Sequence, residues 1–168
     1  FTLSIRVSGW AGEGARLSID GVDIALLDVM EDGYASLTRG WKGESLVLLT
    51  LPMRARRLYA NPKVRDNAGC AAFAWGPLVY CFEGADNPAP LCMLRVKREA
   101  LPRIQPFDPN LLGGVRTLKI EGLRLSMPEG ALYREEPPQE EDITLTAIPY
   151  YAFANRDSKD MRVWMPEA

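Results

Sequence analysis

The stretch of residues 69–87, GCAAFAWGPLVYCFEGADN, decides the fold. It contains two short apolar runs, 70–75 and 78–82, separated by Gly76-Pro77. Short runs that are rich in aromatic and β-branched residues and bounded by Gly and Pro predict buried strands rather than helices. Because proline cannot donate to a sheet ladder, we expect Pro77 at the start of the second strand or in a bulge. The polar residues that follow predict that the chain leaves a dense apolar core after Phe82.

Short segments on both sides of this stretch predict further strands, which are half-buried where apolar and polar residues alternate and apolar on both faces at residues 44–51. They are residues 2–7, 15–19, 34–38, 44–51, 91–97, 115–120, 123–127, 143–147 and 161–165. Asp20-Gly21 predicts a hairpin turn, and Gly122 predicts a bulge or tight turn between two strands. Residues 22–30 fit either a strand or a short helix, and residues 157–160 fit a turn.

About ten short strands without a long amphipathic helix predict an all-β fold, an antiparallel β-sandwich that is jelly-roll-like or Ig-like. The 168 residues suffice for one domain or for two small packed sandwich modules, and in the second case the break falls near residues 52–62.

The composition and net charge argue against a nucleic-acid-binding protein and against a membrane protein. The chain is 47% hydrophobic and 25% charged, which is typical of a globular protein, and its net charge is −2. This charge favours neither nucleic acid nor an anionic membrane, and no apolar run approaches the roughly 20 residues of a membrane span. The chain begins in strand rhythm at Phe1 without an initiator methionine or a signal peptide, so we expect a piece of a longer protein.

The sequence contains no histidine, which excludes a Ser-His-Asp triad, a Cys-His dyad and a His-ligated zinc site within this segment. Its three cysteines, Cys70, Cys81 and Cys92, are too widely spaced for a zinc knuckle, and their odd number argues against a closed disulfide set. We expect inert buried thiols, and unpaired cysteines favour a cytoplasmic location.

Hydrolysis by paired carboxylates needs no histidine, so the acidic residues near turns are the remaining catalytic candidates. They are Glu44, Glu83, Asp86 and Asp157. A glycosidase needs two carboxyl groups on opposite sides of one bond, one of them with a raised pKa. Spacing along the chain does not indicate such a pair, and we expect these residues to be solvated or to cap turns.

Two charged segments have both a structural and a functional interpretation. Arg54, Arg56 and Arg57 predict an edge strand protected by charge, or alternatively a patch for phosphate or sugar acids. The Glu- and Pro-rich residues 128–142 predict a mobile surface loop. A metal site is not expected there, since carboxylates in a flexible loop are not preorganised for a cation.

Aromatic residues offer a platform on which a sugar ring could stack. Trp10 and Trp41 lie beside glycines in turns, where we expect exposure or contact with another domain, and Tyr150-Tyr151 follow a proline. The competing interpretation is core packing, where aromatic side chains provide most of the buried area. We expect core packing for Trp164. The candidate carbohydrate-binding residues are therefore Trp10, Trp41, Tyr150 and Tyr151.

Four segments, taken in chain order, resemble the bacterial β-L-arabinofuranosidases of glycoside hydrolase family 127. They are IRVSGWA (5–11), GYASL (33–37), GPLVYCFEGADN (76–87) and IPYYAFANR (148–156), the last running on to MRVW (161–164). The resemblance implies that this chain is the C-terminal β-sandwich region of such an enzyme, over residues 1–168. If there are two modules, residues 1–53 form a first, incomplete one and residues 54–168 the second.

The resemblance also implies where catalysis occurs in the parent enzyme, a bacterial protein of carbohydrate metabolism. In this family a preceding (α/α)6 barrel holds a cysteine-bound zinc ion and a cysteine nucleophile. None of the three cysteines here matches that motif, so no catalytic residue, metal ligand or cofactor is expected in this segment. The expected role is a non-catalytic accessory region that packs on the catalytic barrel or mediates dimerisation. The alternatives are a carbohydrate-binding module that uses the exposed aromatics, and an enzyme in its own right.

Overall fold

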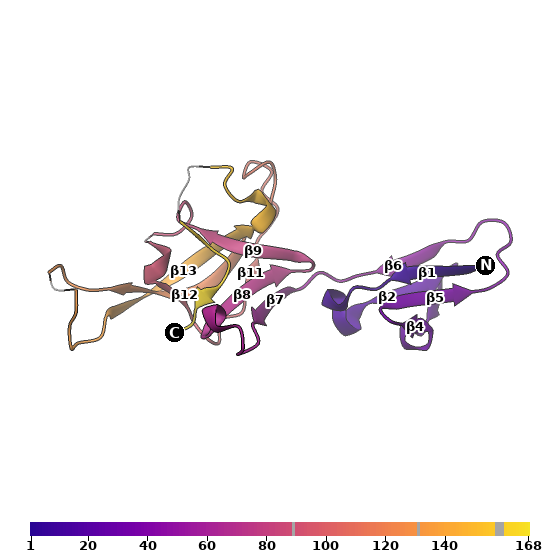
Figure 1. Cartoon of the computed structure of the whole chain (residues 1–168). Helices are drawn as coiled ribbons and strands as arrows, with labels where there is room; N and C mark the ends of the chain where they lie inside the picture. Colours follow the sequence, from indigo (N-terminus) through magenta and orange to yellow (C-terminus); the bar gives the residue numbers. More distant parts are fainter. Residues whose placement is uncertain (89, 131, 157–159) are drawn as a thin grey trace. The chain divides into compact units, whose positions relative to one another are not determined.

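The computed structural model describes residues 1–88, 90–130, 132–156 and 160–168. Its strands form three antiparallel sheets, and the helices of the described residues are 3-10 turns of three to six residues. The expectation of an all-β, antiparallel fold is therefore confirmed. The chain divides into two compact units, Phe1–Arg54 and Ala55–Ala168, which are drawn in Figure 1. Most of the turn expected at residues 157–160 lies outside the described residues.

The first unit is a small sandwich of two three-stranded sheets. Their strand orders are β1 (Thr2–Arg6)–β5 (Tyr34–Thr38)–β4 (Met30–Glu31) and β3 (Val22–Ile24)–β2 (Arg16–Ile19)–β6 (Val47–Thr50). Leu17 and Ile19 from one sheet share an apolar cluster with Ala35 and Leu37 from the other. Burial alternates along β2 and β5, as the sequence pattern predicts.

Tight turns set the strand register of this unit. Asp20 and Gly21 connect β2 to β3 with φ angles of 51° and 81°, and Asp32 and Gly33 connect β4 to β5 with 49° and 82°. Positive φ at both central residues is what a type I′ hairpin turn requires, so the predicted Asp-Gly hairpin is confirmed. Residues 22–30 combine both expected structures, with β3 followed by a 3-10 helix at Leu26–Val29.

The second unit is built on one curled nine-stranded sheet. The main order is β10 (Leu94–Val96)–β12 (Leu118–Ser126)–β13 (Gln139–Pro149)–β9 (Leu78–Glu83)–β8 (Cys70–Trp75)–β15 (Met165–Pro166). Three further strands pair outside this order: β7 (Ala55–Tyr59) with β8, β11 (Arg103–Ile104) with β12, and β14 (Met161–Arg162) with β9.

The stretch that decides the fold forms the hairpin β8–β9. The pair Trp75–Leu78 closes it, so Gly76 and Pro77 are the two turn residues. Pro77 therefore lies in the turn, and its expected position at the strand start or in a bulge is wrong. The φ of 55° at Gly76 fits the first position of a type II′ turn, and the fixed negative φ of proline fits the second.

The C-terminal segment completes this hairpin at its open end. Beyond the pair Phe73–Tyr80, β8 and β9 no longer pair with each other. Instead, Arg162 of β14 pairs with Phe82, and Met165 of β15 pairs with Ala71. The single strand expected over residues 161–165 is thus two short strands joined by a bend, because each must pair with a different arm of the splayed hairpin.

Two other expectations in this unit are corrected. Residues 118–126 form one continuous strand rather than two, although Gly122 is needed there. A Cβ at Gly122 would lie 2.5 Å from the Arg95 carbonyl oxygen and 2.7 Å from Leu145 Cδ1. The expected loop 128–142 is shorter, because residues 139–142 continue β13 and pair with residues 123–126.

The curled sheet carries apolar side chains on both faces. Its inner face forms the main core, with Phe73, Tyr80, Phe82, Leu118, Ile120 and Leu145 among the buried members. Its outer face is covered around Cys81 and Ile148 by the connections that contain Val115, Ala152 and Val163. Because β9 is covered on both faces, its apolar residues run continuously instead of alternating.

Candidate functional site

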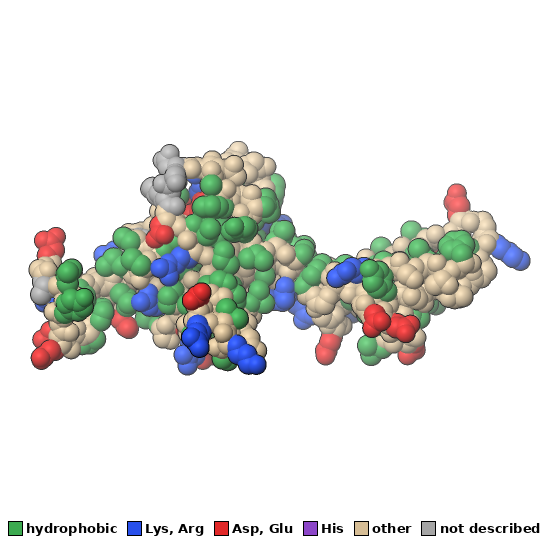
Figure 2. Space-filling model, viewed as in Figure 1, with side chains coloured by type: hydrophobic (Ala, Val, Ile, Leu, Met, Phe, Trp, Pro, Cys, Tyr) green, Lys and Arg blue, Asp and Glu red, His purple; other side chains and the backbone are tan. Residues whose placement is uncertain are grey.

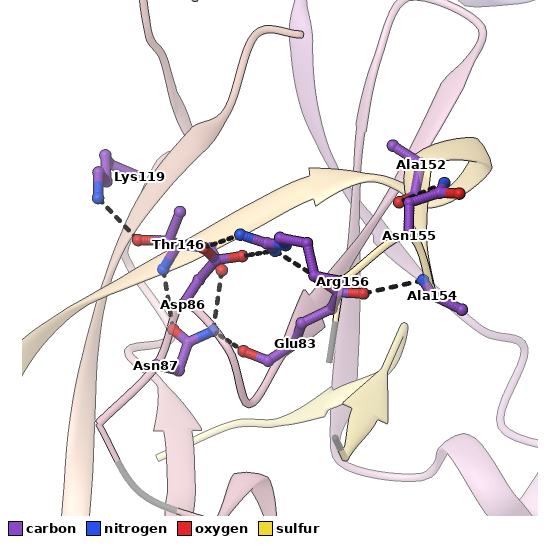
Figure 3. A network of polar contacts seen from close by, with 9 residues as sticks. All are labelled: Glu83, Asp86, Asn87, Lys119, Thr146, Ala152, Ala154, Asn155 and Arg156. Atoms are coloured by element: carbon purple, nitrogen blue, oxygen red, sulfur yellow. Dashed lines mark hydrogen bonds and ion pairs between the residues drawn. The ribbon is translucent and has the colours of Figure 1, made fainter. Parts of the chain in front are cut away.

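A dense network of polar side chains surrounds the end of β9 in the second unit (Figure 3). Glu83 is the last residue of β9, Asp86 lies in the following turn, and Arg156 follows the 3-10 helix Tyr150–Ala152. Arg156 Nη1 donates to Asp86 Oδ1 at 2.7 Å, and its Nη2 donates to Asp86 Oδ2 at 2.5 Å and to Glu83 Oε2. The backbone N–H of Ala154 donates to Glu83 Oε1 at 3.1 Å. One guanidinium therefore joins two segments about seventy residues apart in the chain.

Asn87 extends this network to the neighbouring strand (Figure 3). Its amide nitrogen donates to the carbonyl oxygens of Glu83, at 2.7 Å, and Thr146, at 3.0 Å. Its amide oxygen accepts from the Thr146 N–H at 3.0 Å. The Asn87 amide thus makes the hydrogen bonds to the Thr146 backbone that a neighbouring strand would make, because β9 no longer pairs with β13 at this residue. An unpaired backbone N–H or carbonyl at this depth would be costly.

Charge and burial explain the titration behaviour of the network. Hydrogen bonds from Arg156 to Asp86 and then to Glu83 raise the pKa of the guanidinium above its ordinary value. Burial, with a smaller contribution from the nearby carboxylates of Glu83 and Asp86, raises the pKa of the Cys81 thiol to about 12. A thiol with so high a pKa is protonated near neutral pH and is a poor nucleophile.

The carboxylate candidates do not form a facing catalytic pair in the described residues. Glu83 and Asp86 are brought together, but both bind the same guanidinium. Glu44 is exposed and lies in the first unit, and Asp157 lies outside the described residues. Among the described residues, no group of three or more Cys, Asp or Glu side chains is positioned to hold a metal ion.

Trp10 and Trp41 are half-buried against the core of the first unit rather than fully exposed. Contact of these residues with another domain, the other expectation, stays a prediction. Trp41 stacks on Phe1 with ring centroids 5.5 Å apart, and its Nε1 donates to the Phe1 carbonyl oxygen at 2.8 Å. The Arg39 guanidinium lies 5.1 Å from the centre of the same ring. These contacts occupy much of the Trp41 surface that a sugar would need.

Tyr150 and Tyr151 are the more accessible pair, with 49% and 64% of their surfaces exposed. They lie on the 3-10 helix Tyr150–Ala152 at the end of β13. Tyr150 stacks on Phe153 with centroids 6.3 Å apart. The Arg156 network holds the end of this segment in place. The tyrosines belong to the second unit and the two tryptophans to the first.

The three predicted arginines are used in structural contacts. Arg54 donates to the Ala11 carbonyl oxygen at 3.1 Å, and Arg56 donates to that of Gly76 at 2.9 Å. Arg57 lies on β7, which pairs with β8 at the edge of the sheet, as expected. The interpretation as an edge strand is supported over a patch for anions.

Arg57 closes the curled sheet, a role that the sequence did not reveal. Its Nη1 donates to the carbonyl oxygens of Lys97, at 2.8 Å, and Ala100, at 3.0 Å, just beyond β10. Its Nη2 lies 2.5 Å from Glu167 Oε1, and both side chains are more than 90% buried. Glu167 also forms a parallel bridge with Val96 of β10. These contacts link β7, at one edge of the curled sheet, to β10, at the other edge.

The cysteines differ in exposure, and all three are free. Cys81 is buried as expected, but Cys70 is half-buried and Cys92 is exposed, so the expectation of buried thiols is wrong for these two. No helix in the described parts of the chain has the length and apolar character needed to cross a bilayer.

An apolar hollow of about 340 Å³ opens on the first unit. Its walls are mainly apolar, with Val7, Ala15, Leu26 and Met30 among the lining residues. Leu27 also contributes to the lining and is 90% exposed. So exposed a leucine beside an apolar hollow is typical of a surface that another polypeptide covers.

Two family models match the chain, one over each unit. The glycoside hydrolase family 127 C-terminal domain matches residues 55–166, and the GH127 middle domain of β-L-arabinofuranosidases matches residues 1–53. The chain therefore belongs to glycoside hydrolase family 127, as the resemblance of its sequence motifs indicated.

Individual relatives support this assignment over the whole chain. The non-reducing end β-L-arabinofuranosidase of Bifidobacterium longum subsp. longum is 35% identical over 167 residues, which are 95% of this chain and 25% of that protein. The crystal structure of a GH127 β-L-arabinofuranosidase from Geobacillus stearothermophilus T6 matches with a TM-score of 0.92 at 37% identity. That match covers 100% of this chain and 26% of the other.

A second solved structure, of a GH127 β-arabinofuranosidase, matches with a TM-score of 0.87 at 29% identity, over 100% of this chain and 28% of that chain. The chain thus spans about a quarter of the length of these relatives. The relatives are larger multidomain proteins in which further domains accompany the two units.

Proposed function

We propose that this chain is a non-catalytic accessory region of a glycoside hydrolase that acts on β-L-arabinofuranosides, and that it packs on the remainder of the parent polypeptide. The observation that carries the proposal is the match of the entire chain to only 26–28% of solved family 127 enzymes. Three quarters of each relative, including ample length for a catalytic domain, therefore lies outside the matching region.

The side chains support a structural role. The closest pair of candidate carboxylates, Glu83 and Asp86, is held by Arg156, and the buried thiol of Cys81 has a raised pKa. The apolar hollow beside Leu27 supplies a surface of the kind that packs on another domain. Family membership provides the substrate class, since both named enzymes above are β-L-arabinofuranosidases.

Hydrolysis of a chromogenic β-L-arabinofuranoside by the full-length parent polypeptide tests the proposal. The variants are Glu83→Gln with Asp86→Asn, and Cys70→Ser with Cys81→Ala and Cys92→Ser. Each should keep kcat within about threefold of the wild type under conditions where circular dichroism shows it to be folded. A folded variant that loses a thousandfold in kcat would place catalysis in this region and contradict the proposal, because losses of that size accompany removal of a catalytic group.

Glycan contact is the second candidate function, and the exposure of Tyr150 and Tyr151 is the observation that favours it. Calorimetric titration of the full-length protein with arabinan oligosaccharides tests it. A binding event that is separate from the active site and is lost in Tyr150→Ala and Tyr151→Ala would support this function. Trp41→Phe is the control, since the Trp41 ring is already covered by Phe1 and Arg39. Identical titrations of wild type and tyrosine variants would exclude it.

A further inference from the structure

A polar hollow of about 320 Å³ opens on the second unit beside strands β12 and β13. Its volume lies at the lower end of the range for small-molecule sites, which is roughly 300–1,000 Å³. Unlike the apolar hollow of the first unit, it offers mainly groups that form hydrogen bonds. Its lining consists of two cations, two carboxylates, one hydroxyl and one aliphatic side chain, from Lys97, Arg103, Glu121, Asp142, Thr144 and Ile143.

The strand register brings the polar side chains to the outer face of the curled sheet. Glu121 of β12 is paired with Thr144 of β13, and their chain neighbours Ile120 and Leu145 are buried in the main core. Because successive side chains of a strand point to opposite faces of a sheet, Glu121 and Thr144 lie on the outer face. The two cations come from β11 and from the residue after β10, and both of these strands pair with β12. Three neighbouring segments therefore supply the polar groups of the hollow together with β12.

Two ion pairs hold the charged groups of the hollow in place. Lys97 Nζ lies 2.7 Å from Asp142 Oδ1, and Arg103 Nη1 donates to Glu121 Oε1 at 3.0 Å. The hydrogen bond with Asp142 raises the pKa of the Lys97 ammonium, and the carboxylate of Glu121 adds to this effect. Between 37% and 77% of each of the four side chains is exposed. Figure 2 shows that charged side chains of both signs reach the surface of this unit. The four groups of the hollow are therefore both positioned and accessible to a ligand.

The balance of charge in the hollow indicates the class of ligand. Two cations accompany two carboxylates, so neither a phosphate nor a metal cation meets an excess of the opposite charge. A neutral polyol fits this arrangement, because each of its hydroxyls both donates and accepts a hydrogen bond. Carboxylates only accept, ammonium and guanidinium groups only donate, and the Thr144 hydroxyl does both. The aliphatic Ile143 adds an apolar contact for the C–H groups of a ring.

We propose that this polar hollow binds one unit of a neutral saccharide, with Glu121 and Asp142 accepting hydrogen bonds from its hydroxyls and the two cations donating to them. The site is additional to the glycan contact considered above for the two tyrosines. Binding here would keep a glycan chain beside the enzyme and raise the effective concentration of substrate. The choice of L-arabinose as the saccharide rests on the proposed function, whereas the existence of the site does not.

Methyl NMR of the full-length polypeptide, labelled at threonine methyl groups and titrated with L-arabinose, tests the proposal. Thr144→Ser identifies the reporter signal, because it removes the methyl group and keeps the hydroxyl. The Thr144 signal should shift saturably, and the signal of the exposed Thr50 in the first unit should not move. Sodium phosphate and calcium chloride, titrated separately, should leave the Thr144 signal in place. A response to D-galactose but not to L-arabinose would support the site and contradict the substrate class of the proposed function.

Removing the carboxylates tests their role. Glu121→Ala with Asp142→Ala should raise the Kd for L-arabinose, measured from the Thr144 signal, more than about tenfold. The other threonine methyl signals should keep their positions in this variant, which shows that it is folded. Glu44→Ala is the matched control, since Glu44 is also an exposed carboxylate but lies in the first unit, and it should leave the Kd unchanged.

Tyr150→Ala with Tyr151→Ala separates this site from the tyrosines and should also leave the Kd unchanged. A Thr144 signal that neither saccharide moves, or that phosphate or calcium moves in their place, would overturn the proposal. A Kd that the tyrosine variant raises and the carboxylate variant does not would overturn it as well.

Discussion

Replacing Arg156 by Met should destabilise the second unit substantially. The substitution removes the cation that two carboxylates share, and the side chains of Glu83 and Asp86 are only 7% and 15% exposed. Breaking a buried ion pair by removing one partner costs about 3–5 kcal/mol, because the remaining charge is left without compensation. A quarter of the Arg156 side chain is exposed, so water can reach the vacated site. We therefore expect a loss of about 2–4 kcal/mol in the free energy of unfolding.

Urea denaturation followed by circular dichroism measures this loss as a lower midpoint at an unchanged slope. The control is a triple variant in which Arg156→Met is combined with Glu83→Gln and Asp86→Asn. Removing both charges along with their partner should recover at least half of the lost stability, and the amide oxygen introduced by Glu83→Gln can still accept from the Ala154 N–H. If the free energy of unfolding of the single variant lay within about 0.5 kcal/mol of that of the wild type, the network would contribute only what exposed ion pairs do. That result would refute the reasoning.

Three other predictions concern neighbouring positions. Gly122→Ala should lower the free energy of unfolding, measured by urea denaturation, by about 2–3 kcal/mol, because the new methyl group would meet a carbonyl oxygen at 2.5 Å. The control is Gly40→Ala, whose methyl group would meet nothing within 4 Å and should leave the stability nearly unchanged. Equal losses in the two variants would contradict this argument. Asn87→Ala should lower the free energy of unfolding by about 2–4 kcal/mol, because it leaves the backbone N–H and carbonyl of Thr146 without their partner. It should also speed amide hydrogen exchange at Thr146, and an unchanged exchange rate would contradict this role of Asn87. Burial raises the pKa of Cys81 from 9.0 and that of Tyr80 from 10.0, each to about 12. Both groups are neutral when protonated, so the folded state favours their protonated form. Their contribution to the free energy of unfolding is therefore complete below their pKa in the unfolded chain and is lost as the pH rises toward 12. Cys81→Ala should make stability fall less steeply between pH 9 and 11 in thermal melts, and an unaltered slope would count against a buried thiol.

Local chemistry made the strands and tight turns predictable. The Asp-Gly pairs demand positive φ, and the alternation along β2 and β5 matches one buried face, so both features follow from a few adjacent residues. The two strands on either side of Gly76-Pro77 were predictable from their short apolar runs, but the place of the proline in the turn between them was not.

The polar network could not be predicted, because its members lie far apart in the chain. The sequence places Glu83 and Asp86 at the polar end of a strand, but nothing in the local sequence pairs them with Arg156, about seventy residues later. Arg57 and Glu167 are 110 residues apart and meet only because the sheet curls. The half-burial of Trp10 and Trp41 could not be predicted for a related reason, since adjacent glycines predict a turn but not what packs against it.

The sequence by itself determined the strand-rich fold, the main hairpins and the family, because these depend on side-chain periodicity, on the backbone preferences of Gly, Pro and Asp, and on short motifs. Only the tertiary structure decided the pairing of β14 and β15 with the splayed hairpin, the closure of the sheet by Arg57, and the shared guanidinium of Arg156. The physical reason is that sheet curvature and strand order bring distant residues within hydrogen-bond range, and neither is encoded in any single segment.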